Sequence, residues 1–119
     1  MFPERTAVQI RPYTDGTEHF CSVERRGRGR RLRLSFRIAR PSSLKSAWLR
    51  SHPDGEADFR QMRRVHDGPW ERWDAAIVLK ADRLAYRFVL EDQQGHLWHY
   101  NQRGVVPNHT GDEADFVHL

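Results

Sequence analysis

Aromatic side chains are the residues of this sequence best suited to binding chemistry. Three of the four tryptophans, Trp70, Trp73 and Trp98, lie in the C-terminal half together with Tyr86 and Tyr100. The ordinary role of any single tryptophan is packing in a core, because the ring buries a large apolar area. A ring that stays at the surface would instead be available to a ligand.

Trp98 and Tyr100 share one face of a short strand, and Leu97 and His99 share the other. If Leu97 faces the core, the two rings face outward next to Asn101. A flat aromatic pair can stack on the C–H face of a sugar while planar amides bond its hydroxyl groups. The alternative is that the pair packs against a neighbouring domain or subunit. The predicted carbohydrate-binding residues are Trp98, Tyr100, Trp70 and Asn101.

The residue types that commonly act in catalysis or bind metals form no catalytic or metal-binding pattern in this sequence. Of the seven histidines only His96 and His99 are close, and at this spacing on a strand they point to opposite faces. The one cysteine, Cys21, excludes an internal disulfide and a metal–thiolate cluster. Serine, histidine and aspartate form no nucleophile elbow, and many carboxylates lie in turns, which favour Asp for backbone reasons. We therefore expect no catalytic residue, no metal and no cofactor.

Positive charge is concentrated in residues 25–40, RRGRGRRLRLSFRIAR. This segment holds eight arginines and no acid within a net charge of +4, so the rest of the chain sums to −4. A nucleic-acid-binding protein usually spreads basic residues over a whole face and keeps acids away from it. We therefore expect no nucleic-acid partner and interpret these arginines as the solvent-facing coat of a strand. Polyanion binding by the segment is a separate alternative, and no role is assigned to Arg25 and the residues up to Arg31.

Alternation with period two predicts the secondary structure. Leu32, Leu34, Phe36 and Ile38 alternate with polar residues, and the same period recurs in residues 73–79 and 84–90, which places Trp73 in the core. Turn signals lie at HPDG (52–55), HDGP (66–69) and DQQG (92–95). We expect strands in residues 32–38, 43–51, 58–65, 70–80, 84–92 and 96–101, a last edge strand in 115–119, and weaker strands in 7–11 and 19–23. Short, regularly spaced strands without a helical stripe predict an all-β, immunoglobulin-like antiparallel β-sandwich of about 7–8 strands.

The length of 119 residues fits one domain, residues 1–119. No apolar run approaches the ~20 residues of a membrane span, and the N-terminus lacks the pattern of a signal peptide. We therefore expect no membrane partner and a cytoplasmic location.

The C-terminal half carries the motifs of a known family. One strand begins with an aromatic–x–x–Trp–acid–Ala pattern, the next carries Leu-x-Tyr-x-Phe-x-Leu, and a hairpin ends in aromatic residues and glycine. The residues are Trp70, Trp73, Asp74 and Ala75, then Leu84, Tyr86, Phe88 and Leu90, then Trp98, Tyr100 and Gly104. The chain thereby resembles the N-terminal starch-binding module, carbohydrate-binding module family 34, of neopullulanases, cyclomaltodextrinases, maltogenic amylases and maltodextrin glucosidases. The resemblance covers about residues 30–119 and rests mostly on core and turn residues.

The resemblance implies a non-catalytic N-terminal domain of a longer family 13 glycoside hydrolase. Such a domain binds α-glucan or maltooligosaccharide and helps to shape the active site. Its implied partners are the catalytic barrel of the same polypeptide and a second copy in a homodimer. The chain alone is then no enzyme, whereas the parent protein is an α-glycosidase that hydrolyses O-glycosyl bonds. The alternative is a structural or dimerisation module with no independent sugar binding.

Overall fold

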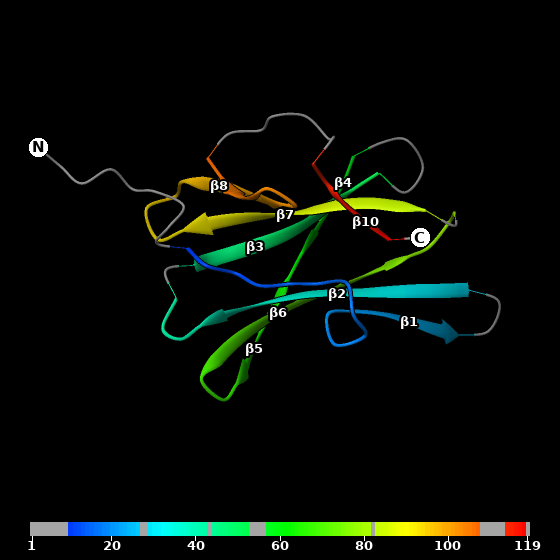
Figure 1. Cartoon of the computed structure of the whole chain (residues 1–119), viewed down its shortest axis with the longest axis horizontal. Coiled ribbons are helices and arrows are strands. Elements are labelled where there is room, and N and C mark those ends of the chain that lie inside the picture. Colours follow the sequence, from blue (N-terminus) through cyan, green and yellow to red (C-terminus); the bar gives the residue numbers. More distant parts are fainter. Residues whose placement is uncertain are drawn as a thin grey trace, which may run out of the picture.

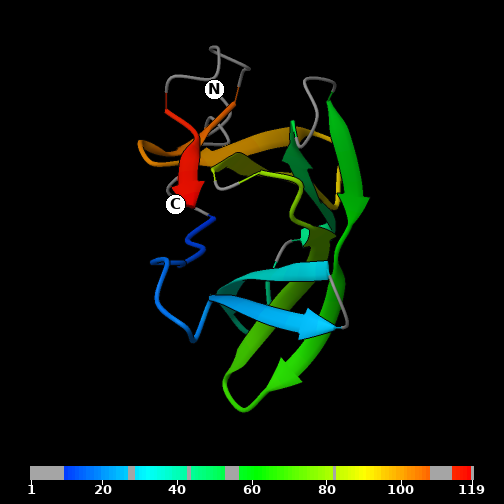
Figure 2. The same ribbon diagram turned by 90° about the vertical axis from the view of Figure 1, so that its right-hand side faces the viewer.

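Two antiparallel β-sheets packed face to face make up the described part of the chain (Figure 1 and Figure 2). The structure is a computed structural model and describes residues 10–26, 29–42, 44–52, 57–81, 83–107 and 114–118. These ranges contain ten strands and no helix, which confirms the predicted all-β sandwich with more strands than expected. The strands are β1 Cys21–Arg26, β2 Gly29–Ala39, β3 Leu44–Ser51, β4 Asp58–Gln61, β5 Arg63–Asp67, β6 Trp70–Val78, β7 Leu84–Asp92, β8 Leu97–Asn101, β9 Gly104–Val106 and β10 Phe116–His118.

Sheet A has the strand order β1-β2-β6-β5. Its longest strand, β2, follows the predicted alternation, because its four inward apolar side chains are at most 4% exposed: Leu32, Leu34, Phe36 and Ile38. Trp73 on β6 lies opposite Phe36, and the two rings stack with centroids 6.3 Å apart, so the prediction that Trp73 belongs to the core is confirmed. The outward residues Arg31 and Arg33 are exposed, as expected for an arginine-coated strand.

Sheet B has the order β4-β3-β7-β8-β9, and β10 also pairs with β7. The four inward side chains of β7 are buried, as the alternation predicted: Leu84, Tyr86, Phe88 and Leu90. The turn at DQQG forms the hairpin between β7 and β8, and Gly95 supplies the positive φ of 84° that this turn requires. The predicted C-terminal strand is also present, since β10 pairs with the first residues of β7.

The segment predicted as one strand over residues 58–65 is two strands in different sheets. β4 pairs with β3 in sheet B, whereas β5 pairs with β6 in sheet A. Met62 lies at the crossing, is 5% exposed, and donates its backbone N–H to the carbonyl of Ala47 at 2.8 Å. A sandwich corner is commonly made by a chain that changes sheets at such a bend. The alternating pattern in residues 58–65 is too short to show where the chain passes from one sheet to the other.

The N-terminal segment lies beside β2 without joining the sheet as a full strand. Tyr13 and Arg37 exchange two backbone hydrogen bonds of 2.8 and 2.9 Å in a single bridge. The predicted strand in residues 19–23 begins later, at Cys21, and extends to Arg26. Residues 7–9 of the other weak strand, and residues 53–55 of the HPDG turn, lie outside the described residues. Figure 2 shows the N-terminal segment, in blue, beside the red β10 at the edge of the sandwich.

Within the described ranges no helix is long and apolar enough to cross a lipid bilayer.

Candidate functional site

The aromatic pair Trp98 and Tyr100 lies in the core, so the predicted outward orientation is wrong. β8 pairs with β7 in a register that places Trp98 opposite Leu90 and Tyr100 opposite Phe88, both inward residues. The two rings are 4% and 8% exposed, whereas Leu97 is 50% exposed. A buried ring offers no face to a sugar, and the two aromatics therefore make no stacking platform.

The polar groups of this strand also serve the fold. Trp98 donates its indole N–H to Oδ2 of Asp92 at 3.1 Å, and Oδ1 of the same carboxylate accepts two backbone N–H groups of the turn that follows. Asn101 is 1% exposed, and its Oδ1 accepts the backbone N–H of Arg103 at 2.8 Å. The predicted contribution of Asn101 to a surface site is therefore wrong as well, because its amide closes the turn after β8.

Trp70 is the residue of the predicted set that reaches the surface. It opens β6 on the outer face of sheet A and is half-buried. The guanidinium carbon of Arg37 lies 4.4 Å from the centroid of the Trp70 ring and 5.2 Å from that of Tyr13, which is 46% exposed. These three residues from three separate segments form one row, which we call the outer strip: Tyr13, Arg37 and Trp70.

Phe20 packs against the outer strip and is itself in contact with Arg72. Phe20 is 3% exposed and meets the Tyr13 ring edge-on, with centroids 5.4 Å apart. The guanidinium carbon of Arg72 lies 5.6 Å from the centroid of the Phe20 ring, and Nε of Arg72 donates to Asp74 at 2.9 Å. The strip therefore combines aromatic surface with guanidinium N–H donors in a fixed arrangement. The outer strip was not predicted from the sequence, because Tyr13 and Trp70 are far apart in the chain.

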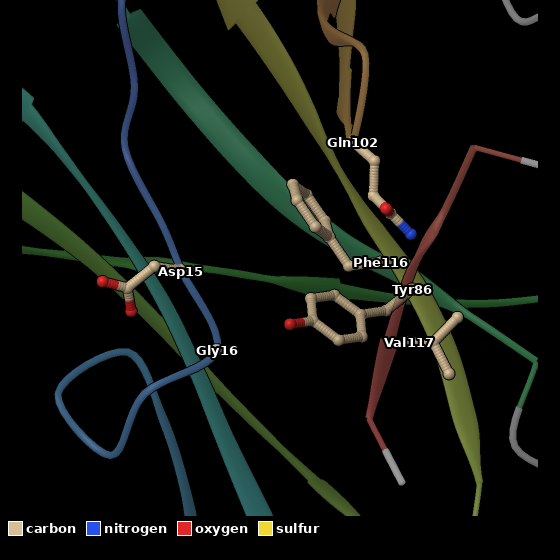
Figure 3. A pocket seen from close by; sticks show the side chains of 6 residues that line it. All are labelled: Asp15, Gly16, Tyr86, Gln102, Phe116 and Val117. Atoms are coloured by element: carbon tan, nitrogen blue, oxygen red, sulfur yellow. The ribbon is translucent and has the colours of Figure 1, made fainter.

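A hollow lies at the edge of the sandwich, where the N-terminal segment approaches β10 (Figure 3). Its volume is about 340 Å³, and its lining residues are Asp15, Gly16, Tyr86, Gln102, Phe116 and Val117. Figure 3 shows the Tyr86 hydroxyl directed from the floor toward the stretch Asp15–Gly16. The rings of Tyr86 and Phe116 lie beside each other, with centroids 5.5 Å apart and planes 31° apart. We call this hollow the edge pocket.

Alkaline pH is expected to destabilise the protein through its buried tyrosines. Burial raises the pKa of Tyr86 far above its ordinary value of 10.0 and also raises the pKa of Tyr100. Above about pH 10 the unfolded chain releases these protons and the folded chain keeps them, so the free energy of unfolding falls as pH rises further. Urea unfolding at neutral pH and above about pH 10 measures the loss. A Tyr86→Phe variant should lose less stability over this interval, and an equal loss would contradict the assignment to Tyr86.

Other titratable groups form no reactive centre among the described residues. No group of three or more His, Cys, Asp or Glu side chains there is placed to hold a metal ion. The thiol of Cys21 lies 3.5 Å from Nδ1 of His118, but burial raises the pKa of this thiol. A reactive cysteine needs a lowered pKa, so this pair has the wrong electrostatics for a nucleophile.

The arginine-rich segment does not present an unbroken basic surface where the structure describes it. Arg33 lies 3.6 Å from the carboxylate of Glu24, and Asp74 accepts from Arg72 on the same outer face. The acids between the arginines favour the interpretation as a solvent-facing coat over polyanion binding.

Comparison with known proteins identifies a similar fold. No protein-family model matches the sequence, and no curated protein matches it. A solved structure named cyclomaltodextrinase superposes on 91% of this chain with a TM-score of 0.73 and 12% sequence identity. The chain covers 19% of that protein, so it spans about a fifth of the length of this structural relative. At this identity the likeness establishes the fold alone.

Proposed function

We propose that this chain is a non-catalytic β-sandwich module of an α-glucan-degrading glycoside hydrolase, and that it binds α-glucan or maltooligosaccharide. The observation that carries the proposal is the fold likeness to a cyclomaltodextrinase, which includes 91% of this chain but 19% of that enzyme. An enzyme of that size has room for a catalytic barrel of about 250 residues outside the module. In this proposal the catalytic groups belong to that barrel, and residues 1–119 are the N-terminal domain beside it.

The outer strip is the sugar-binding surface in this proposal. Tyr13 and Trp70 supply aromatic surface, and the Arg37 guanidinium between them supplies N–H donors. An α-glucan has both apolar C–H faces and hydroxyl groups, so it can contact the rings and accept from the guanidinium at once. Of the four residues predicted to bind carbohydrate, Trp70 is the one that keeps this role in the proposal.

The proposal is tested by titrating the protein with maltoheptaose and following tryptophan fluorescence, with cellohexaose as the control sugar. A saturable change with the α-glucan alone is the expected result. No change with either sugar at millimolar concentration would contradict the proposed function.

Trp70→Ala is expected to weaken maltoheptaose binding about tenfold, the order of one lost aromatic contact. Calorimetric titration measures the affinity, and thermal unfolding checks that the half-exposed site leaves the fold intact. Trp48→Ala is the matched control, because Trp48 is also half-buried but lies on the outer face of sheet B. Equal losses of affinity in the two variants would remove Trp70 from the binding surface.

The outer face of sheet B favours a second candidate function, an interaction module that docks on a barrel or a second copy. Leu97 on β8 is 50% exposed and Phe59 on β4 is 57% exposed. Exposed apolar side chains of this size are typical of surfaces that another protein covers.

Leu97→Asp distinguishes the two functions. In the interaction module it is expected to weaken dimerisation or domain docking of the full-length protein, measured by sedimentation velocity, and to leave maltoheptaose binding unchanged. Unchanged assembly would contradict the second candidate.

A further inference from the structure

The edge pocket has a polar group directed into it, the hydroxyl of Tyr86. The Tyr86 side chain is 3% exposed, and its hydroxyl is directed into the pocket toward Asp15 and Gly16 (Figure 3). A group that enters the pocket can therefore reach the Tyr86 hydroxyl, which can donate or accept a hydrogen bond.

The remaining walls suit a small ligand with hydroxyl groups. The tilted rings of Tyr86 and Phe116 form an apolar floor. At the rim, Gln102 donates its Nε2 to the backbone carbonyl of Asp115 at 2.8 Å, which fixes the amide beside the opening. A volume of about 340 Å³ lies near the lower end of the range for small-molecule sites. The site is thus sized for a chain end and not for a long chain.

The charge around the pocket favours a neutral ligand. Asp15 is the ionisable carboxylate at its wall, but Oδ1 accepts from Thr17 and Oδ2 accepts from the Tyr13 hydroxyl at 2.9 Å. Figure 3 shows this carboxylate turned away from Tyr86. The groups directed at the opening are then a phenol and an amide, which bond hydroxyl groups without demanding a charge.

We propose that the edge pocket binds the terminal glucosyl residue of an α-glucan chain. This inference rests on the proposed function and adds to it a second subsite. The hydrogen bond between Tyr13 and Asp15 joins the outer strip to the pocket wall, so both sites meet on residues 13–16. A glucan lying along the strip can place its end in the pocket, where the Tyr86 hydroxyl and the Gln102 amide bond the sugar hydroxyls.

Two substitutions test the subsite by calorimetric titration of the full chain with maltoheptaose. Tyr86→Phe removes only the hydroxyl and should weaken binding about twofold to tenfold, the value of one hydrogen bond. Gln102→Ala should weaken it similarly. The matched control is Gln93→Ala, because Gln93 is also exposed and also donates its amide to a backbone carbonyl, that of Leu44 at 3.2 Å.

Amide NMR with maltose as the probe gives a second readout. Gly16 lines the pocket and should shift on adding maltose, whereas Gly68 and Gly95, in distant hairpin turns, should not. Sugar binding that leaves Gly16 unshifted and is unchanged in Tyr86→Phe and Gln102→Ala would overturn the subsite and leave the proposed function standing. Failure of the natural chain to bind either sugar would overturn both.

Discussion

Trp98→Ala is expected to destabilise the protein by about 3–5 kcal/mol, the usual cost of truncating a large buried aromatic residue. Trp98 is 4% exposed and belongs to the apolar cluster between the two sheets. The substitution also takes the indole N–H from Oδ2 of Asp92, a carboxylate with no exposed surface that organises the β7–β8 turn. The cavity and the lost hydrogen bond therefore both destabilise the hairpin formed by β7 and β8. Urea unfolding measures the difference.

Two variants separate these contributions. Trp98→Phe keeps most of the apolar volume and removes the bond to Asp92, so an intermediate loss of about 1–3 kcal/mol is expected. Trp70→Ala is the positional control and should change the free energy of unfolding much less, because that ring is half-buried outside the core. A fully stable Trp98→Ala variant with weakened sugar binding would instead place Trp98 at the surface and contradict the register of β8.

Arg87→Met is the second substitution with a large expected effect, a loss of about 3–5 kcal/mol. Arg87 lies on β7 with no exposed surface, and its Nη1 is 3.6 Å from Oδ1 of Asp115, whose side chain is 1% exposed. Removing the guanidinium leaves a buried carboxylate without its cation, which costs more than the attraction between the two charges contributes. The pair also joins β10 to the sheet, since Asp115 immediately precedes that strand.

A double variant identifies the cause of this loss. Arg87→Met combined with Asp115→Leu removes both charges and should recover much of the stability, because apolar pairs often replace buried ion pairs without loss. Chemical unfolding of the two single variants and the double variant gives the coupling energy. A double variant that loses the sum of the two single losses would show that the charges act independently.

Much of the fold could be predicted from alternation alone. The apolar row of β2 leaves one choice of inward face, because the opposite choice would bury Arg31 and Arg33. The rows of β6 and β7 have the same period, although β7 also buries Arg87 on its other face. Trp73 and Tyr86 were in phase with such rows and are buried. The turns at HDGP and DQQG were equally readable, since Gly68 and Gly95 adopt the positive φ that these turns need.

The candidate site was predicted less well, because β8 has apolar residues on both faces. Leu97 and Trp98 point in opposite directions, and either could face inward by composition. The choice was made by hairpin pairing with β7, which places Trp98 on the side of Leu90. This register depends on the conformation of the loop between β7 and β8. A shift of one residue would turn every side chain of β8 to the opposite face.

The sequence by itself determined that this protein is an antiparallel all-β sandwich with an arginine-coated strand, because side-chain period and turn chemistry are local properties. Only the tertiary structure decided which aromatics meet the solvent and which segments share a site. The outer strip joins Tyr13 to Trp70, and the edge pocket joins Gly16 to Tyr86 and Gln102. Such contacts between distant segments depend on strand pairing and on where the chain crosses between sheets, and neither is encoded in a local pattern.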